Sequence, residues 1–127
     1  MPAHYAIDLE NRIVRTTFSG VIIHNDPIEH SRKLSKDPAF DPSFSELIEF
    51  EEVSDIEVNM ADLLGLLGID PFSQHSRRAF VIGSRNVIYG IVRMYEILRS
   101  DTPCVKIFET RDEALPWLIS ASHRVAG

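Results

Sequence analysis

The sequence has one cysteine and no long apolar segment. The first observation excludes an internally disulfide-bonded protein, and the second argues against a membrane-spanning one. Cys104 is the only cysteine among 127 residues, so the chain can form neither an internal disulfide nor a cysteine-based zinc site. We expect its thiol to be a small buried apolar group. No apolar run approaches the roughly 20 residues that cross a bilayer, and the N-terminus lacks a basic segment followed by an apolar one. We therefore expect a cytoplasmic protein without a membrane span.

Basic residues are absent from the middle of the chain. Between residues 37 and 74 there are ten Asp and Glu residues and no Lys or Arg, whereas the remainder holds all 13 basic residues and nine acidic ones. The net charge of −6 argues against a nucleic-acid partner, because phosphate binding needs a cationic surface. The separation of charge favours encounters with a basic protein or with a second copy of the chain. A solvated acidic rim, partly neutralised by Arg77 and Arg78, is the alternative.

Catalytic and cofactor motifs are also missing. No Gly-x-Ser-x-Gly elbow surrounds a serine, the five histidines are scattered, and the acids that follow Glu49 lack the pattern of a calcium-binding loop. We therefore expect no enzyme, no metal site and no cofactor. The turn Gly83-Ser84-Arg85-Asn86 could receive an anion through Ser84 and Arg85, although plain helix capping explains the same residues.

The alternation of strand-like and helix-like patterns predicts the fold. An unbroken apolar run at residues 79–82 ends at Gly-Ser and gives way to helical spacing, which is typical of a buried strand that leads into a covering helix. Strands are predicted at residues 5–9, 12–18, 46–50, 77–82 and 105–108, and helices at residues 27–36, 60–67, 84–99 and 110–119. The order ββαβαβαβα predicts one α/β domain over residues 1–127, with parallel strands, right-handed crossovers and an antiparallel N-terminal hairpin.

Three local features give more detailed expectations. Asn11 is expected to adopt the left-handed conformation in the hairpin turn, because Asn tolerates it. Pro116 is expected to kink or interrupt the last helix, because proline clashes with the preceding helical turn. The helix at residues 60–67 is expected to bury one face, which consists of Met60, Leu63, Leu64 and Leu67.

Several stretches resemble one protein family over nearly the whole chain. These stretches are Thr17-Phe18-Ser19-Gly20, residues 37–44, residues 77–82, Arg93-Met94-Tyr95-Glu96 and residues 113–118. On them the sequence resembles the uncharacterised bacterial SpoIIAA-like family, which is related to STAS domains and to the lipid-binding CRAL-TRIO fold. The resemblance implies a mixed four- to five-stranded sheet with helices mainly on one face.

The resemblance does not extend to phosphorylation. Anti-sigma factor antagonists of the STAS group place a phosphorylatable serine in the turn that follows the third strand. This chain has Glu57-Val58-Asn59-Met60 at that place, and Ser54 comes several residues too early. The phosphoacceptor serine of the antagonists is therefore lacking.

These observations favour a non-enzymatic, STAS-like regulatory or protein-interaction module. It would bind a protein partner, or form a homodimer, through the acidic segment and the start of the following helix, with contact residues Glu51, Glu52, Asp55, Glu57, Asn59 and Asp62. The alternative is a CRAL-TRIO-like carrier or sensor of a small apolar ligand. Its pocket would be lined by Leu63, Leu66, Leu67, Ile69, Phe72, Met94 and Tyr95.

Overall fold

Five strands form one mixed sheet, in the same order in which they occur along the chain. The structure, a computed structural model, describes residues 3–84, 86–99 and 104–126. Its elements are β1 (Ala3–Asp8), β2 (Ile13–Ile23), α1 (Asp26–Ser35), β3 (Ser45–Glu57), α2 (Met60–Ile69), β4 (Arg78–Val81), α3 (Asn86–Leu98), β5 (Val105–Phe108) and α4 (Arg111–Ala126). β1 and β2 are antiparallel, and the later neighbours are parallel. The predicted ββαβαβαβα order is confirmed.

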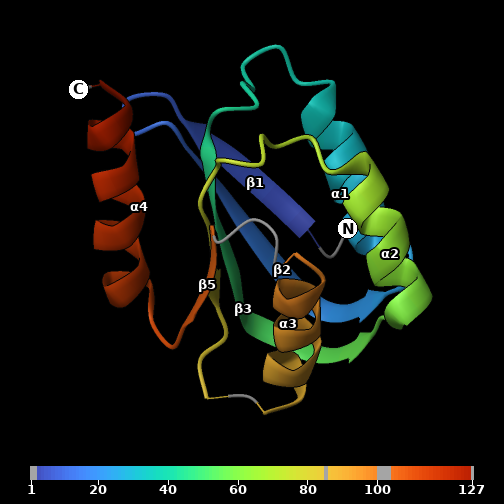
Figure 1. The fold of residues 1–127 in the computed structure, drawn as a ribbon. Coiled ribbons are helices and arrows are strands. Elements are labelled where there is room, and N and C mark those ends of the chain that lie inside the picture. Colours follow the sequence, from blue (N-terminus) through green and yellow to red (C-terminus); the bar gives the residue numbers. More distant parts are fainter. Residues whose placement is uncertain (1–2, 85, 100–103, 127) are drawn as a thin grey trace.

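Three helices cover one face of the sheet, and the fourth covers the other. α1, α2 and α3 lie on one side in Figure 1, and α4 lies on the opposite side. Successive strand residues point to opposite faces, so Ile48 and Phe80 join the core beneath α2 and α3, while Leu47 and Ala79 pack against Leu118 of α4. The expectation of helices mainly on one face is therefore confirmed. In the part of the chain that the structure describes, none of the helices has the length and hydrophobicity of a transmembrane helix.

The acidic segment after Phe50 is a strand and not the polar connection that its composition indicated. β3 has 13 residues and pairs with β2 as far as the pair Ile23 and Glu57, whereas β4 pairs with residues 46–49 of β3. Two irregularities in the β2–β3 register accompany Gly20, which has a φ of 69°. The far ends of β2 and β3 therefore form a two-stranded ribbon that extends beyond β4.

The hairpin between β1 and β2 differs from the prediction in one residue. Arg12, and not Asn11, has the left-handed backbone, with a φ of 58°. Asn11 is instead fixed by Asp8: its backbone N–H donates to Asp8 Oδ1 at 3.1 Å, and its side-chain amide donates to Asp8 Oδ2 at 2.9 Å. Because the Asx-type hydrogen bonds of Asp8 hold Asn11, the left-handed conformation falls on the next residue, Arg12.

Two expectations about the helices are wrong in part. Met60 and Leu64 are 44% and 53% exposed, whereas Leu63 is buried and Leu67 packs on the core. Apolar residues surround almost the whole of α2, so their spacing could not select the buried face. α4 continues through Pro116, so the predicted interruption does not occur. Thr110 fixes its first turn by accepting from the Glu113 N–H at 3.3 Å.

Candidate functional site

A cavity of about 80 Å³ lies between the sheet and the three helices that cover it. The sheet and the loops around it contribute Phe18, Ile22, Glu46, Ile48, Phe50, Ile56, Val58, Asp70, Arg78 and Phe80 to its wall. The helices contribute Pro27, His30, Ser31, Leu63, Leu66, Ile91, Val92 and Tyr95. Most of this wall is hydrocarbon, and the charged residues are gathered at one end.

Aromatic rings form the sheet side of the cavity. Phe18, Phe50 and Phe80 stand on three adjacent strands, with centroid distances of 5.5 and 6.0 Å and interplanar angles of 8° and 10°. The ring of Tyr95, from α3, meets Phe80 edge-on at 5.6 Å. Rings at these separations are in favourable contact. They give the cavity an aromatic wall that an apolar molecule can contact.

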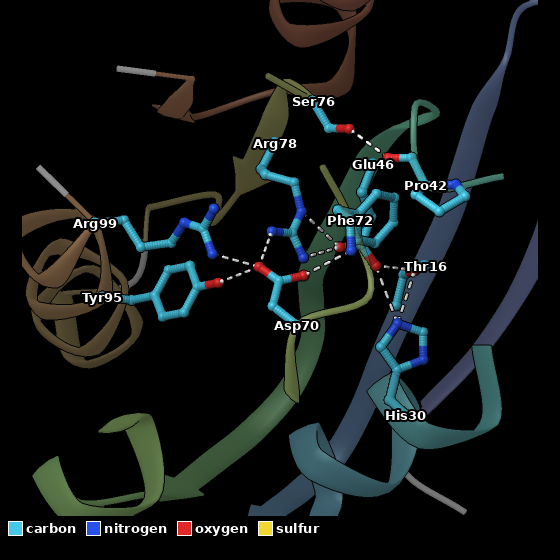
Figure 2. Close-up of polar contacts among 10 residues, drawn as sticks. All are labelled: Thr16, His30, Pro42, Glu46, Asp70, Phe72, Ser76, Arg78, Tyr95 and Arg99. Carbon is cyan, nitrogen blue, oxygen red and sulfur yellow. Dashed lines mark hydrogen bonds and ion pairs between the residues drawn. The ribbon is translucent and has the colours of Figure 1, made fainter. Parts of the chain in front are cut away.

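A buried ionic network forms the charged end of the cavity (Figure 2). Arg78 donates from Nε and Nη2 to Glu46 Oε1, at 3.2 and 3.1 Å, and from Nη1 to Asp70 Oδ2 at 2.7 Å. Arg99 Nη1 also donates to Asp70 Oδ2, and the Tyr95 hydroxyl approaches the same oxygen at 3.4 Å. The Arg78 guanidinium lies 4.2 Å from the ring centre of Phe72. The network thus joins β3, β4, α3 and the segment after α2.

The second oxygen of Glu46 is occupied as well. Glu46 Oε2 accepts from the Thr16 hydroxyl at 2.7 Å and lies 3.0 Å from His30 Nε2. Burial alone would raise the pKa of Glu46, but the hydrogen bond from His30 and the charge of Arg78 outweigh it and lower the pKa to about 2. Glu46 is therefore a carboxylate at neutral pH. Burial raises the pKa of Tyr95, so this phenol keeps its proton.

Sequence reasoning missed this network. Glu46 and Arg78 are opposite each other in the parallel β3–β4 register, each one residue before the apolar part of its strand. A charged residue at the start of a buried strand can be recognised in the sequence and indicates a buried ion pair. The register that brings the two together, and the position of Asp70 after α2, depend on tertiary packing. Arg78 does neutralise acids of the acidic middle of the chain, but it does so inside the core.

The charge separation is weaker on the surface than in the sequence. Three of the ten acids in the middle of the chain are paired with arginines. Glu46 and Asp70 belong to the buried network, and Glu49 accepts hydrogen bonds from Arg111 at 2.7 and 3.1 Å. Arg77 does not face the acidic segment. Its Nη1 donates to the Trp117 carbonyl at 2.8 Å, and its guanidinium lies 4.9 Å from the Trp117 ring centre.

The residues predicted to line an apolar pocket are only partly brought together. Leu63, Leu66 and Tyr95 line the cavity. Leu67 and Met94 pack against the same core cluster without forming the cavity wall. Ile69 is half-buried at the end of α2. Phe72 belongs to a different cluster, with Val14, Leu34 and Phe44, and stacks on Arg78.

The residues predicted to bind a protein partner divide into two groups. Glu51, Glu52, Asp55 and Glu57 are exposed along the β2–β3 ribbon. Asn59 and Asp62 form a capping box at the start of α2, and Asp62 Oδ2 also contacts His24 Nδ1 at 2.6 Å. The predicted helix start at Asn59 is correct, and these two residues therefore have a structural role as well.

Two further sequence predictions concern Ser84 and Cys104. Ser84 is exposed in the turn that precedes α3, while its predicted partner Arg85 lies outside the described residues. Cys104 is half-buried instead of fully buried. Among the described residues, no group of three His, Cys, Asp or Glu side chains is arranged to hold a metal ion.

Comparison with known proteins identifies the fold. No family model and no curated protein matches the chain. It is similar to the crystal structure of an uncharacterized protein of the DUF3478 family with a SpoIIAA-like fold from Shewanella loihica PV-4. The TM-score is 0.58 at 20% sequence identity, over 91% of this chain and 93% of that chain. The fold is therefore SpoIIAA-like, as the sequence resemblance implied.

Proposed function

We propose that this domain is a non-catalytic module that binds a small apolar molecule in the cavity beneath α2 and α3. The observation behind the proposal is the cavity itself, about 80 Å³ with a wall that is mostly hydrocarbon. Protein interiors are close-packed and contain few voids larger than one water molecule. The shape and lining of this space, concave and apolar with polar groups at one end, are those of a ligand site.

The dimensions restrict what can enter. One water molecule needs about 10–15 Å³ of such space, so the cavity has room for a short hydrocarbon segment. Leu66 of α2 and Ile91 of α3 line it and are partly exposed. This favours entry between these two helices, with the remainder of a longer ligand lying along the gap between them.

The polar groups at the cavity support binding without catalysis. Thr16 is fully buried, so its hydroxyl is not accessible to a substrate. The hydroxyl donates to Glu46, whose lowered pKa makes this carboxylate a weak base. The His30 Nε2 atom lies against the same carboxylate. A general base needs a substrate proton within hydrogen-bond reach, and here these groups satisfy one another.

Xenon is a suitable first probe, because it enters apolar cavities without needing hydrogen bonds. We expect the xenon NMR signal to shift in a saturable way on addition of the protein. Val92→Phe should abolish this, since Val92 is buried and lines the cavity. Ile97→Phe is the matched control on the same helix, where Ile97 is 55% exposed. Equal xenon binding by Val92→Phe and the unmodified protein would refute the proposal.

The ribbon formed by β2 and β3 favours a second candidate, binding of a basic protein surface or of a second copy of the chain. Four exposed acids lie along β3, and Val21 and Ile23 on β2 are 47% and 49% exposed. Charge attracts a basic surface, and apolar side chains beside the charges contribute burial energy.

Self-association between this ribbon and a basic surface of a second copy can be measured by sedimentation equilibrium at low and high salt. We expect a dimer at low salt that dissociates when Glu51, Glu52 and Asp55 are changed together to Lys. A control with Glu10→Lys and Asp112→Lys changes exposed acids elsewhere. A chain that stays monomeric at every concentration, or a dimer unaffected by the triple change, would contradict the homodimer.

A further inference from the structure

Among the described residues, and with a neutral His30, the charges at the ionic end of the cavity balance one another. Glu46 and Asp70 supply two carboxylates, and Arg78 and Arg99 supply two guanidinium groups. The side chains of Glu46, Asp70 and Arg78 are 3%, 6% and 7% exposed. A charged group of a ligand bound here would lose its hydration and would find no unpaired opposite charge. Such desolvation of a charge is strongly unfavourable.

Most acceptor positions of the two carboxylates are already occupied by hydrogen bonds. Glu46 Oε1 accepts two bonds from Arg78, and Glu46 Oε2 is occupied by Thr16 and His30. Asp70 Oδ1 accepts from the Phe72 N–H at 3.1 Å, and Asp70 Oδ2 accepts from two arginines. A carboxylate offers about four lone-pair sites. An amine that approached Glu46 or Asp70 Oδ2 would therefore have to displace an existing hydrogen bond.

The Tyr95 hydroxyl is the donor that the network holds most weakly. It approaches Asp70 Oδ2 at 3.4 Å, whereas O–H···O bonds are normally about 2.7–2.8 Å long. Tyr95 lines the cavity, and its ring is fixed against Phe80. The hydroxyl hydrogen can rotate about the C–O bond, and Asp70 would keep its two arginines and the Phe72 N–H if that bond were lost.

We infer that the ligand is an uncharged, mainly hydrocarbon molecule with an oxygen acceptor, such as a ketone, ester or alcohol oxygen, that accepts a hydrogen bond from the Tyr95 hydroxyl. This inference rests on the proposed function and specifies its ligand class. The hydrocarbon part lies along Phe18, Phe50 and Phe80, and the oxygen lies at the ionic end. Fatty-acid anions, phosphates and amines are disfavoured by the balanced charge.

Three five-carbon probes test the inference: 2-pentanone, pentanoate and pentylammonium. Each is titrated into the protein while backbone amide chemical shifts around the cavity are recorded, with xenon as the probe that lacks a polar group. We expect 2-pentanone to bind at least about tenfold more tightly than either ion, given the cost of burying a charge. Tyr95→Phe should weaken the binding of 2-pentanone by about fivefold, because one neutral hydrogen bond is lost. It should leave xenon binding unchanged.

The outcomes separate this inference from the proposed function. If neither xenon nor any five-carbon probe binds, both are wrong. If xenon binds but pentanoate or pentylammonium equals 2-pentanone, the ligand class is wrong and the proposed function stands. If Tyr95→Phe binds 2-pentanone as tightly as the unmodified protein, the assignment of the hydrogen bond to Tyr95 is overturned. The comparison among probes uses the unmodified protein and does not depend on how well Tyr95→Phe folds.

Discussion

Removing Arg78 should destabilise the domain more than removing its neighbour Arg77. Arg78 is 6% exposed and contacts both Glu46 and Asp70. Arg78→Met leaves these buried carboxylates with fewer compensating cations, and breaking a buried pair in this way costs about 3–5 kcal/mol. Such a loss is a large part of the roughly 5–15 kcal/mol that keeps a domain folded. Arg77→Met, which removes contacts with Trp117 on the other face, should cost about 1 kcal/mol.

The cause of the loss can be isolated with a double-mutant cycle. Glu46→Gln removes one carboxylate charge while keeping the side-chain shape, and Arg78→Met with Glu46→Gln leaves Asp70 and Arg99 as a balanced pair. We expect the double variant to be more stable than the sum of the two single losses by about 1–3 kcal/mol. Urea unfolding followed by circular dichroism measures all four proteins. Losses that add to within about 0.5 kcal/mol would refute electrostatic coupling as the reason.

Three further predictions follow from individual residues. The lowered pKa of Glu46, about 2 against an ordinary 4.5, contributes about 3 kcal/mol of stability above pH 4.5 that is lost as pH falls toward 2. Glu46→Gln should therefore flatten the dependence of the urea midpoint on pH in that range, and an unchanged slope would contradict this. On α2, Leu63→Ala should cost about 2–5 kcal/mol and the exposed Leu64→Ala under about 0.5 kcal/mol in the same assay; equal losses would mean that the buried face is misassigned. Gly20→Ala forces a side chain into a left-handed backbone with a φ of 69° and should cost about 1–2 kcal/mol in thermal unfolding, whereas an unchanged midpoint would show that the irregular β2–β3 register adapts to the side chain.

Local patterns were sufficient for the order of elements. The apolar run before Gly83 and the helical spacing after it correctly predict β4 and α3, and Asn59 correctly predicts the start of α2. Each of these signals is set by residues that are neighbours in the chain. The buried face of α2 could not be predicted in this way, because Met60 and Leu64 are as apolar as Leu63 and only the sheet decides between them.

The candidate site was harder to predict, because its residues are far apart in the sequence. Glu46 and Arg78 are 32 positions apart, and they meet through a strand register that neither strand determines alone. The length of β3 illustrates the same limit. Its acidic half resembles a loop in composition, yet it pairs with the apolar end of β2, so the partner strand and not the local sequence extends it.

Stability alone gives a poor account of the ionic network. Replacing a buried ion group by apolar residues of similar volume is often neutral or stabilising by about 1–4 kcal/mol, so the fold by itself does not require the ion pair of Glu46 and Arg78. The unfilled space is unfavourable to the fold too, since methyl groups that filled it would add contacts. Both departures from a close-packed apolar core occur at one place, where Tyr95 borders the cavity and the network alike. Sites at which a protein departs from the rules of stable packing are expected to be functional, and the coincidence of the two therefore favours a ligand site at this end of the sheet over a defect in packing.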